Sequence, residues 1–295
     1  METSMHRFVL HNDEIRECGD RLLSPGQVGL LGGWGVFSTI RVTSGVLIAF
    51  ERHWSRMQRD AALLRVPFPS EPEYLRSRLL RLVQANRAEN GTLRVAVVRN
   101  RNGKWTGPNS RDFDLIALTA DLTDWGPGAR LAVERNARFA GSPYAGAKTT
   151  SWVLNLAYLE KAQANGFDEV VLLNEREEVS ECASANIFAS VGSEVWTPPL
   201  SSGCLPGVTR DLLLSEVRAE GITVADKPLR LGDLERADEV FITSVNRDLL
   251  PVLSIEGLTT QCKGEARERL AAAYRRYLEA YIAAHRQRAP SRERE

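Results

Sequence analysis

The sequence predicts an α+β protein made of two α/β halves, and three observations support that class. Paired β-branched runs with a turn between them occur alongside amphipathic segments of helical period. Strands and helices alternate in the second half, but hairpins occur as well as helices, which favours α+β over a doubly wound parallel sheet. The chain has 295 residues, of which 43% are hydrophobic and 26% charged, so it can bury a sizeable core without disulfides or metals.

The first half contains a predicted hairpin, two helices and two strands. The predicted elements are a hairpin over residues 36–50, helices over 51–66 and 72–89, and strands over 92–100 and 112–120. The hairpin rests on two β-branched runs that flank a turn at Thr43, Ser44 and Gly45. Pro67 and Pro69 end the first helix, because proline lacks the backbone N–H that a helix interior needs.

Residues 121–128, with the sequence DLTDWGPG, fit neither periodicity and form the predicted linker between two domains. We therefore expect a smaller N-terminal α/β domain over 1–120, a larger domain over 129–285 and a flexible polar tail over 286–295. In the larger domain the predicted elements are strands over 130–135, 169–175, 186–191 and 239–244, and helices over 151–166, 209–220 and 263–285.

The charge and cysteine content narrow the class of partner. The chain balances 38 Lys and Arg against 38 Asp and Glu, so no net field draws it to nucleic acid or to a membrane surface. Its four cysteines are scattered without metal-ligand spacing, which predicts no metal site and favours a reducing cytoplasm. The first residues lack a long apolar core, so neither a signal peptide nor a membrane anchor is expected. A small-molecule partner is the expectation.

A candidate anion site lies where Leu205, Pro206 and Gly207 lead into an amphipathic helix. The first N–H groups of a helix have no partner within it, and together with the positive end of the helix dipole they favour a phosphate. Thr209 adds a hydroxyl in the first turn. Taken alone, the segment also fits an ordinary helix start in which Thr209 only caps the helix.

A longer pattern surrounds this segment. Its residues are Glu181, Ser184, Asn186, Ile187 and Phe188, then Val195, Trp196 and Thr197, then Leu205, Gly207, Val208 and Arg210. This spacing resembles the signature of class IV aminotransferases, the family that includes branched-chain aminotransferases, D-amino acid aminotransferases and aminodeoxychorismate lyases. Residues 32–64, 142–155 and 239–252 resemble the N-terminal hairpin and helix, the lysine segment and the last phosphate-binding turn of the same family.

The resemblance implies the D-amino acid aminotransferase-like fold, with pyridoxal 5'-phosphate in the cleft between two domains. By that resemblance Lys148 would hold the cofactor as a Schiff base and carry a proton between the substrate Cα and the cofactor. Glu181 would lie against the pyridine nitrogen and keep it protonated. Without the other motifs, Lys148 would be interpreted as a surface lysine and Glu181 as one more acid of a charged hairpin.

The resemblance also implies a set of phosphate ligands. Arg56, on the same helix face as His53, resembles the family's phosphate-binding arginine; a solvated arginine is the alternative. The implied cofactor-binding residues are Arg56, Lys148, Glu181, Asn186, Leu205, Gly207, Val208, Thr209, Ser244 and Val245.

Three positions depart from the family pattern. Val153 stands where branched-chain aminotransferases have a tyrosine that bonds the cofactor's phenolic oxygen, and Val245 where many relatives have a hydroxyl residue. Ser38 follows Phe37 where the family often has a glutamate, which leaves the substrate side of the pocket uncertain. Phe37, Arg94 and Arg99 are candidate substrate residues; arginines on strands are more often surface charges.

Transamination is the leading functional hypothesis: an amino acid or amine donates its amino group and a 2-keto acid accepts it. One alternative is an aminodeoxychorismate lyase, which would release pyruvate and give 4-aminobenzoate. Another is a cofactor-binding protein without turnover, although phosphate binding alone does not require Lys148 together with Glu181. The resemblance also implies a homodimer, while the preference for one hand of the amino acid is not readable from the sequence.

Overall fold

The computed structural model describes residues 4–23, 28–101 and 111–286. The chain divides into two compact units: the first comprises Met1–Thr123 and Arg275–Glu295, and the second comprises Asp124–Tyr274. Residues 275–285, placed in the larger domain by the sequence, thus belong to the first unit. The predicted tail lies outside the described residues except for Arg286. No helix among the described residues is both long and apolar enough to cross a membrane.

The first unit is built on a six-stranded sheet in the order β2-β1-β6-β5-β3-β4, with every pair antiparallel. Its elements are β1 (Met5–His11), β2 (Glu14–Glu17), α1 (Val28–Gly32), β3 (Gly35–Thr43), β4 (Val46–Leu47), α2 (Phe50–Leu63), α3 (Pro72–Asn86), β5 (Gly91–Arg99) and β6 (Phe113–Ala120). The predicted hairpin is confirmed as β3 and β4. Ser44 and Gly45 make its turn at φ 50° and 75°, in the left-handed region.

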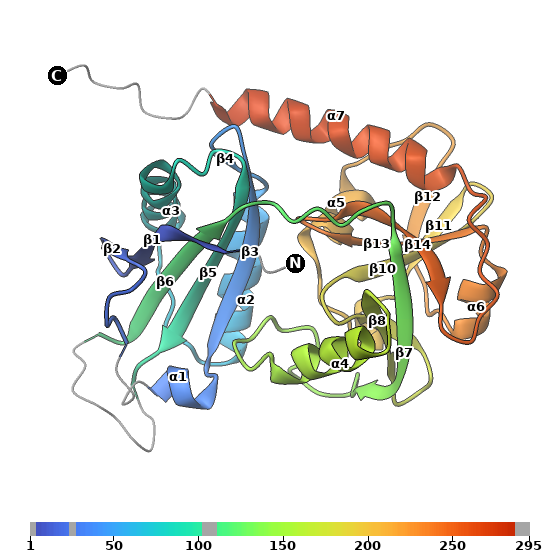
Figure 1. Cartoon of the computed structure of the whole chain (residues 1–295), viewed down its shortest axis with the longest axis horizontal. Helices are drawn as coiled ribbons and strands as arrows, with labels where there is room; N and C mark the ends of the chain where they lie inside the picture. The colour runs from blue at the N-terminus through green and yellow to red at the C-terminus, as the bar shows by residue number, and fades with distance from the viewer. Residues whose placement is uncertain (1–3, 24–27, 102–110, 287–295) are drawn as a thin grey trace. The chain divides into compact units, whose positions relative to one another are not determined.

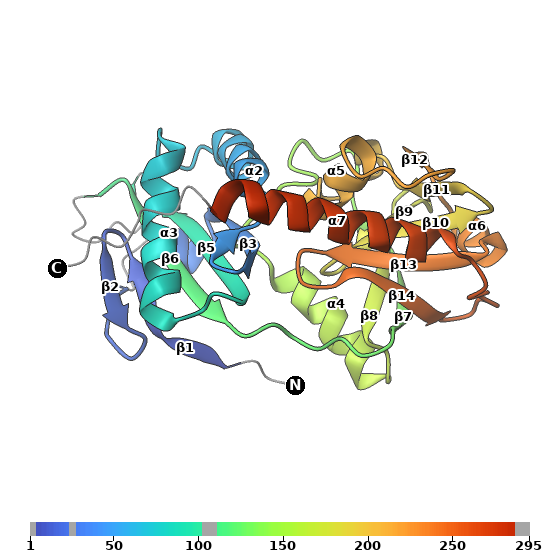
Figure 2. The ribbon, with the colours of Figure 1, turned by 90° about the horizontal axis from the view of Figure 1, so that it is seen from above.

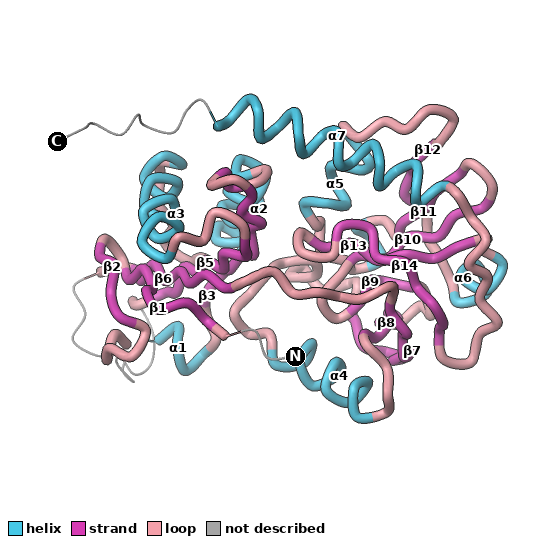
Figure 3. Tube along the Cα trace, turned by 45° about the horizontal axis from the view of Figure 1, so that its top comes forward, coloured by secondary structure: helices cyan, strands magenta, loops and turns pink. Residues whose placement is uncertain are grey.

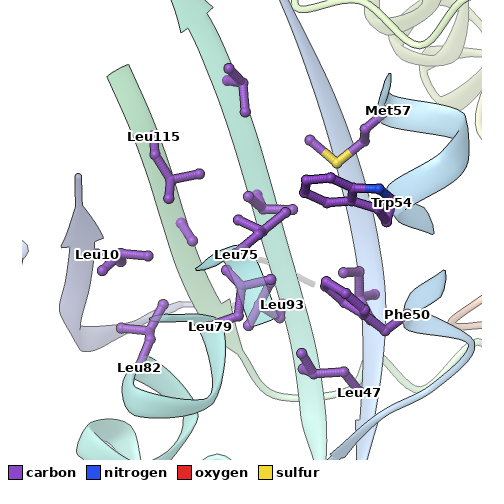
Figure 4. Close-up of a cluster of buried hydrophobic side chains, with 14 of the residues drawn as sticks. Leu10, Leu47, Phe50, Trp54, Met57, Leu75, Leu79, Leu82, Leu93 and Leu115 are labelled. Atoms are coloured by element: carbon purple, nitrogen blue, oxygen red, sulfur yellow. The ribbon is translucent and has the colours of Figure 1, made fainter. Parts of the chain in front are cut away.

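Helices α2 and α3 pack on one face of this sheet (Figure 1). Figure 4 shows Phe50, Trp54 and Met57 of α2 against leucines of α3 and the strands. Burial of each large apolar side chain contributes about 1.5–3 kcal/mol, so this layer is the core of the unit. Because side chains alternate along a strand, Phe37 and Arg94 lie on the opposite face.

The second unit contains an eight-stranded mixed sheet in the order β12-β11-β10-β13-β14-β7-β8-β9. Its elements are β7 (Ala129–Arg138), α4 (Val153–Ala164), β8 (Glu169–Asn174), β9 (Val179–Cys182), β10 (Asn186–Val191), β11 (Glu194–Thr197), the 3-10 turn η1 (Leu200–Ser202), α5 (Val208–Ser215), β12 (Thr223–Asp226), α6 (Leu231–Arg236), β13 (Glu239–Ser244), β14 (Asp248–Ile255) and the start of α7 (Ala266–Arg286). Helix α4 lies beside β7 and β8 (Figure 2).

Strands β10 and β13 present two different faces. Ile187 and Ile242 point into the apolar core, whereas the rings of Phe188 and Phe241 stack on the other side with centroids 5.1 Å apart. Asn186 pairs with Thr243 in register, so by alternation both side chains lie on the Phe188 face. This face therefore presents polar side chains at one end of the sheet.

Most predicted helices and strands are confirmed, but the helix predicted over 209–220 ends at Ser215. The Ser215 hydroxyl donates to the Asp211 carbonyl at 2.7 Å, and the Val217 N–H donates to the Leu212 carbonyl at 2.8 Å. Both bonds close the last turn instead of extending it. The short strands β1, β2, β9, β11 and β12 and the longer β14 were not among the predicted elements.

Candidate active site

The lysine segment packs against the turn that leads into α5. Lys148 is half-buried, with its Nζ 4.5 Å from the centroid of the Trp152 ring. Gly146 has φ 73°, and a Cβ there would lie 2.7 Å from the Cys204 carbonyl oxygen. Only glycine permits both that backbone angle and that approach. Both connections, over 139–152 and 198–207, appear mainly as loops in Figure 3.

Glu181 of β9 is a buried carboxylate, 6% exposed, that contacts this same turn. Its Oε2 accepts a hydrogen bond from the Leu205 N–H at 3.0 Å, and its Oε1 accepts from Arg138 Nε and Nη2 at 3.3 Å each. Burial raises the pKa of Glu181, while the charge of Arg138, the Leu205 N–H and the charge of Lys148 act in the opposite direction. Lysine and carboxylate therefore share one electrostatic environment.

Asn186 fixes the other side of the turn. Its Nδ2 donates to the Leu205 carbonyl at 2.9 Å, so Leu205 is held through both of its backbone polar groups. A Cβ at Gly207 would lie 2.0 Å from Asn186 Oδ1, so any larger residue there would displace the Asn186 amide. The structure brings together five predicted residues: Lys148, Glu181, Asn186, Leu205 and Gly207.

The start of α5 fits a phosphate. Gly207 is the N-cap, with no side-chain cap, so Thr209 is not the cap that an ordinary helix start would use. The Thr209 Oγ1 is buried and has no hydrogen-bond partner among the described residues, and the same holds for Thr243 Oγ1 on β13. A buried hydroxyl without a partner costs free energy, which an oxygen-rich anion would offset. The residues at the start of α5 therefore fit the phosphate group of a cofactor.

Two arginines of the second unit were not predicted. Arg138 contacts Glu181, and Arg247 follows the predicted Ser244–Val245 turn and donates to Ser184 Oγ at 2.9 Å. Both lie next to predicted elements, but only chain folding shows which side chain meets which. Val153, at the position of the missing tyrosine, begins α4 and is 70% exposed.

In the first unit, Arg56 and His53 lie on the same buried face of α2, as their spacing predicts. Arg56 Nη2 donates to Ser38 Oγ at 2.8 Å, and His53 Nδ1 lies 2.7 Å from the same oxygen. Desolvation lowers the pKa of Arg56 to about 10. The β3 position that often carries a glutamate in the family thus presents a hydroxyl to this guanidinium.

The three substrate candidates separate into a pair and an outlier. The Arg94 guanidinium lies 4.1 Å from the Phe37 ring centroid, and burial lowers its pKa. Arg99 instead donates to the carbonyls of Arg101 and Arg65, at 2.7 and 2.8 Å, and stacks on a tryptophan ring. Arg99 therefore braces loops, whereas Arg94 remains available for a ligand.

A half-buried lysine, a buried carboxylate and a helix start without a side-chain cap thus lie together on a mixed α+β scaffold, an arrangement that suits a phosphate-bearing cofactor. Residues 35–255 match the amino-transferase class IV family, and the chain belongs to that family. The family predicted from the four motifs is confirmed. The chain is an enzyme that uses pyridoxal phosphate to move an amino group between an amino acid or amine and a 2-keto acid.

Three relatives illustrate the similarity. A Methanocaldococcus jannaschii protein provisionally named a branched-chain-amino-acid aminotransferase is 31% identical over 234 residues, 78% of this chain and 81% of its own. The D-alanine aminotransferase of Listeria innocua is 27% identical over 254 residues, covering 85% and 88% of the two chains. The structure of the branched-chain aminotransferase of Thermoproteus uzoniensis with norvaline superposes with a TM-score of 0.83 at 24% identity, covering 94% of this chain and 98% of that one. The fold class predicted from the sequence is confirmed.

Proposed function

We propose that Lys148 is the catalytic base of the transamination and that Glu181 holds the ring nitrogen of the cofactor. One observation carries this proposal: Glu181, Lys148 and the start of α5 meet around Leu205. When bound, pyridoxal phosphate supplies an electron sink that acidifies the substrate Cα–H. Lys148 Nζ takes that proton and returns it at the other end of the transfer. Glu181 favours the protonated ring nitrogen, because its carboxylate is fixed and largely dry.

We propose that the phosphate lies at the start of α5. The N–H groups of Val208 and Thr209 and the Thr209 hydroxyl provide donors, and the Ser244–Val245 turn provides another edge of the site. Arg56 adds a cation by family resemblance. Its hydrogen bond to Ser38 supports this role, because the bond holds the guanidinium in one orientation.

For the substrate, we propose an amino acid whose carboxylate is bound by Arg94 beside Phe37. A planar guanidinium suits a carboxylate, and partial desolvation strengthens that charged contact. The relatives act, by name, on branched-chain amino acids and D-alanine, so these are the first donors to test. Pyruvate release from aminodeoxychorismate, the reaction of the lyase branch of the family, is the alternative outcome.

We further propose a cytoplasmic homodimer. Helix α4 exposes Val153, Leu154 and Leu156 at 70%, 63% and 57%, and Phe139 in the preceding connection is 66% exposed. Large apolar side chains exposed on one helix are typical of a subunit interface. The four cysteines, all in the described part of the chain, form no disulfide, which supports a reducing compartment.

The test starts from the purified protein loaded with pyridoxal phosphate. Borohydride reduction should fix the cofactor on the peptide that contains Lys148, and a Lys148→Ala variant should lose the label and the transamination. Both enantiomers of alanine and of branched-chain amino acids, offered with a 2-keto acid, should identify the donor by conversion of the bound cofactor to its amine form. A label on another lysine would refute the assignment of Lys148. Pyruvate release from aminodeoxychorismate without amino transfer would favour the lyase.

A further inference from the structure

Arg247, in the turn between β13 and β14, carries a buried charge that the proposed chemistry does not use. Its side chain is 5% exposed, and its Nη2 lies 3.2 Å from Oε2 of Glu169, whose side chain is 1% exposed. Its Nη1 donates to Ser184 Oγ at 2.9 Å and to the Ser184 carbonyl at 3.2 Å. Ser184 Oγ in turn donates to Glu169 Oε2. The guanidinium thus joins two segments of the chain that are far apart in sequence.

Those two segments are the turns that flank the candidate site. Residues 183–185 join β9, which carries Glu181, to β10, which starts at Asn186. Residues 245–247 follow Ser244 and include the proposed phosphate edge. Arg247 belongs to the second turn and contacts the first.

The two turns are anchored unequally without the Arg247 side chain. The 183–185 turn has three further bonds: Ala183 N–H to the Val170 carbonyl, Asn155 Nδ2 to the Ala183 carbonyl, and Cys182 N–H to the Ala185 carbonyl. The 245–247 turn has the β13–β14 pairing and a backbone bond from Arg247 N–H to the Ser244 carbonyl. The side chain of Arg247 therefore ties the 245–247 turn to the rest of the site.

Trp125 fixes the plane of the guanidinium. The Arg247 Cζ lies 3.7 Å from the centroid of the Trp125 ring, a cation–π distance that lysine would satisfy without the planar stacking. The Trp125 ring, the Glu169 carboxylate and the Ser184 hydroxyl together hold the guanidinium in one orientation. A buried ion pair adds little net stability over apolar side chains of similar size, although loss of one partner alone is costly.

We infer that Arg247 is a positioning residue, which with Glu169 and Ser184 holds the Ser244–Val245 turn in place for the cofactor phosphate. The inference rests on the proposed function, because it assumes that the turn faces the phosphate. Its consequence is selective: loss of Arg247 weakens recognition of the phosphate end and spares the ring end, which Glu181, Leu205 and Arg138 hold independently.

The experiment compares two ligands on the apoprotein: pyridoxal phosphate and pyridoxal, which lacks the phosphate. Arg247→Met should weaken pyridoxal phosphate binding about tenfold or more, as expected when charge-assisted hydrogen bonds are lost. Pyridoxal binding should change by less than about twofold, within the scatter of remote substitutions. Arg247→Lys should restore part of the selectivity, because the ion pair with Glu169 survives. The affinity ratio is the affinity for pyridoxal phosphate divided by that for pyridoxal. If Arg247→Met leaves this ratio unchanged, the inference is overturned.

Two further variants separate positioning from general stability. Arg267→Met removes a partly buried ion pair with Glu239 at the opposite end of β13, where Nε and Oε2 lie 3.7 Å apart. It should lower the melting temperature without changing the affinity ratio; a ratio that moves as in Arg247→Met overturns the inference. Should Arg247→Met not fold, Ser184→Ala removes one bond to Arg247 and should still lower the ratio.

Thr209→Ala tests the proposed phosphate site itself. If it leaves the affinity ratio unchanged, the assignment of the phosphate to the start of α5 fails. If it lowers the ratio and Arg247→Met does not, the role of Arg247 alone is refuted.

Discussion

Replacing Glu181 by glutamine tests the electrostatic core of the site, because it removes a buried charge and keeps the shape. The Leu205 N–H keeps an acceptor, since the amide oxygen of the new side chain replaces Oε2. Arg138 loses its ionic partner but is 18% exposed and can turn to water. The substitution should therefore fold and should isolate the effect of the charge.

The expected effect on stability is small. At 3.3 Å from Arg138, the carboxylate gains about 5 kcal/mol of Coulomb energy in a medium of effective dielectric constant ~20. Burial nevertheless raises the pKa of Glu181 on balance, so the cost of desolvation exceeds this attraction. We expect the free energy of unfolding of the apoprotein at neutral pH to change by about 1 kcal/mol or less.

The pH dependence has a defined sign. A carboxyl whose pKa is higher in the folded state binds its proton more tightly there, so its contribution favours folding most below its unfolded pKa. This contribution is lost as the pH rises through the folded pKa. The free energy of unfolding of wild type minus that of Glu181→Gln should therefore decrease as the pH rises above the unfolded value. Chemical denaturation of both apoproteins at several pH values measures this difference.

Catalysis should respond far more strongly than stability. Loss of a preorganised charge at the ring nitrogen should reduce kcat about 10²–10³-fold, as for loss of other preorganised electrostatic groups. The assay is steady-state amino transfer from an amino acid to a 2-keto acid, which gives kcat. Glu178→Gln is the matched control, because the Glu178 carboxylate binds Arg176 and Ser202. This variant should leave kcat unchanged. A Glu181→Gln variant with kcat within about threefold of wild type, or an apoprotein weakened by more than about 3 kcal/mol, would refute the reasoning.

The same contacts lead to three other predictions. Gly146→Ala should lower the free energy of unfolding by about 1–3 kcal/mol and weaken cofactor binding, because its Cβ would meet the Cys204 carbonyl oxygen. Calorimetry and cofactor titration measure the two effects, and no change in either would contradict this close approach. Arg94→Ala should raise KM for the amino acid about tenfold or more and leave the melting temperature unchanged, whereas Arg99→Ala should lower the melting temperature and leave KM unchanged. Steady-state kinetics and thermal melts measure both, and the opposite result for the two variants would contradict the roles assigned to them. Hydrogen bonding to Arg176 lowers the pKa of Glu178 from 4.5 to about 2, so the stability that the ionised carboxylate provides is present above pH 4.5 and is lost as the pH falls toward 2. In an acid titration, Glu178→Gln should lose less stability than wild type. An identical titration of the two proteins would argue against the bond.

Short-range patterns were enough to define most of the longer helices, several strands and the family. The β3–β4 hairpin follows from β-branched runs around Gly45, and α2 from a helical period that prolines terminate. Such signals can be read from the sequence, because propensity and periodicity act over a few residues. The four motifs that predicted the family can be read for the same reason: each lies within one continuous stretch of chain.

Which distant side chains meet depended on the folded chain. Arg138 reaches Glu181, Arg247 reaches Glu169, and Arg99 is committed to carbonyl groups while Arg94 lies over Phe37. No local pattern reveals these partners, since the sequence shows each arginine only as a charge on or near a predicted strand. Their roles depend on contacts across long loops, which the packing of the whole unit selects.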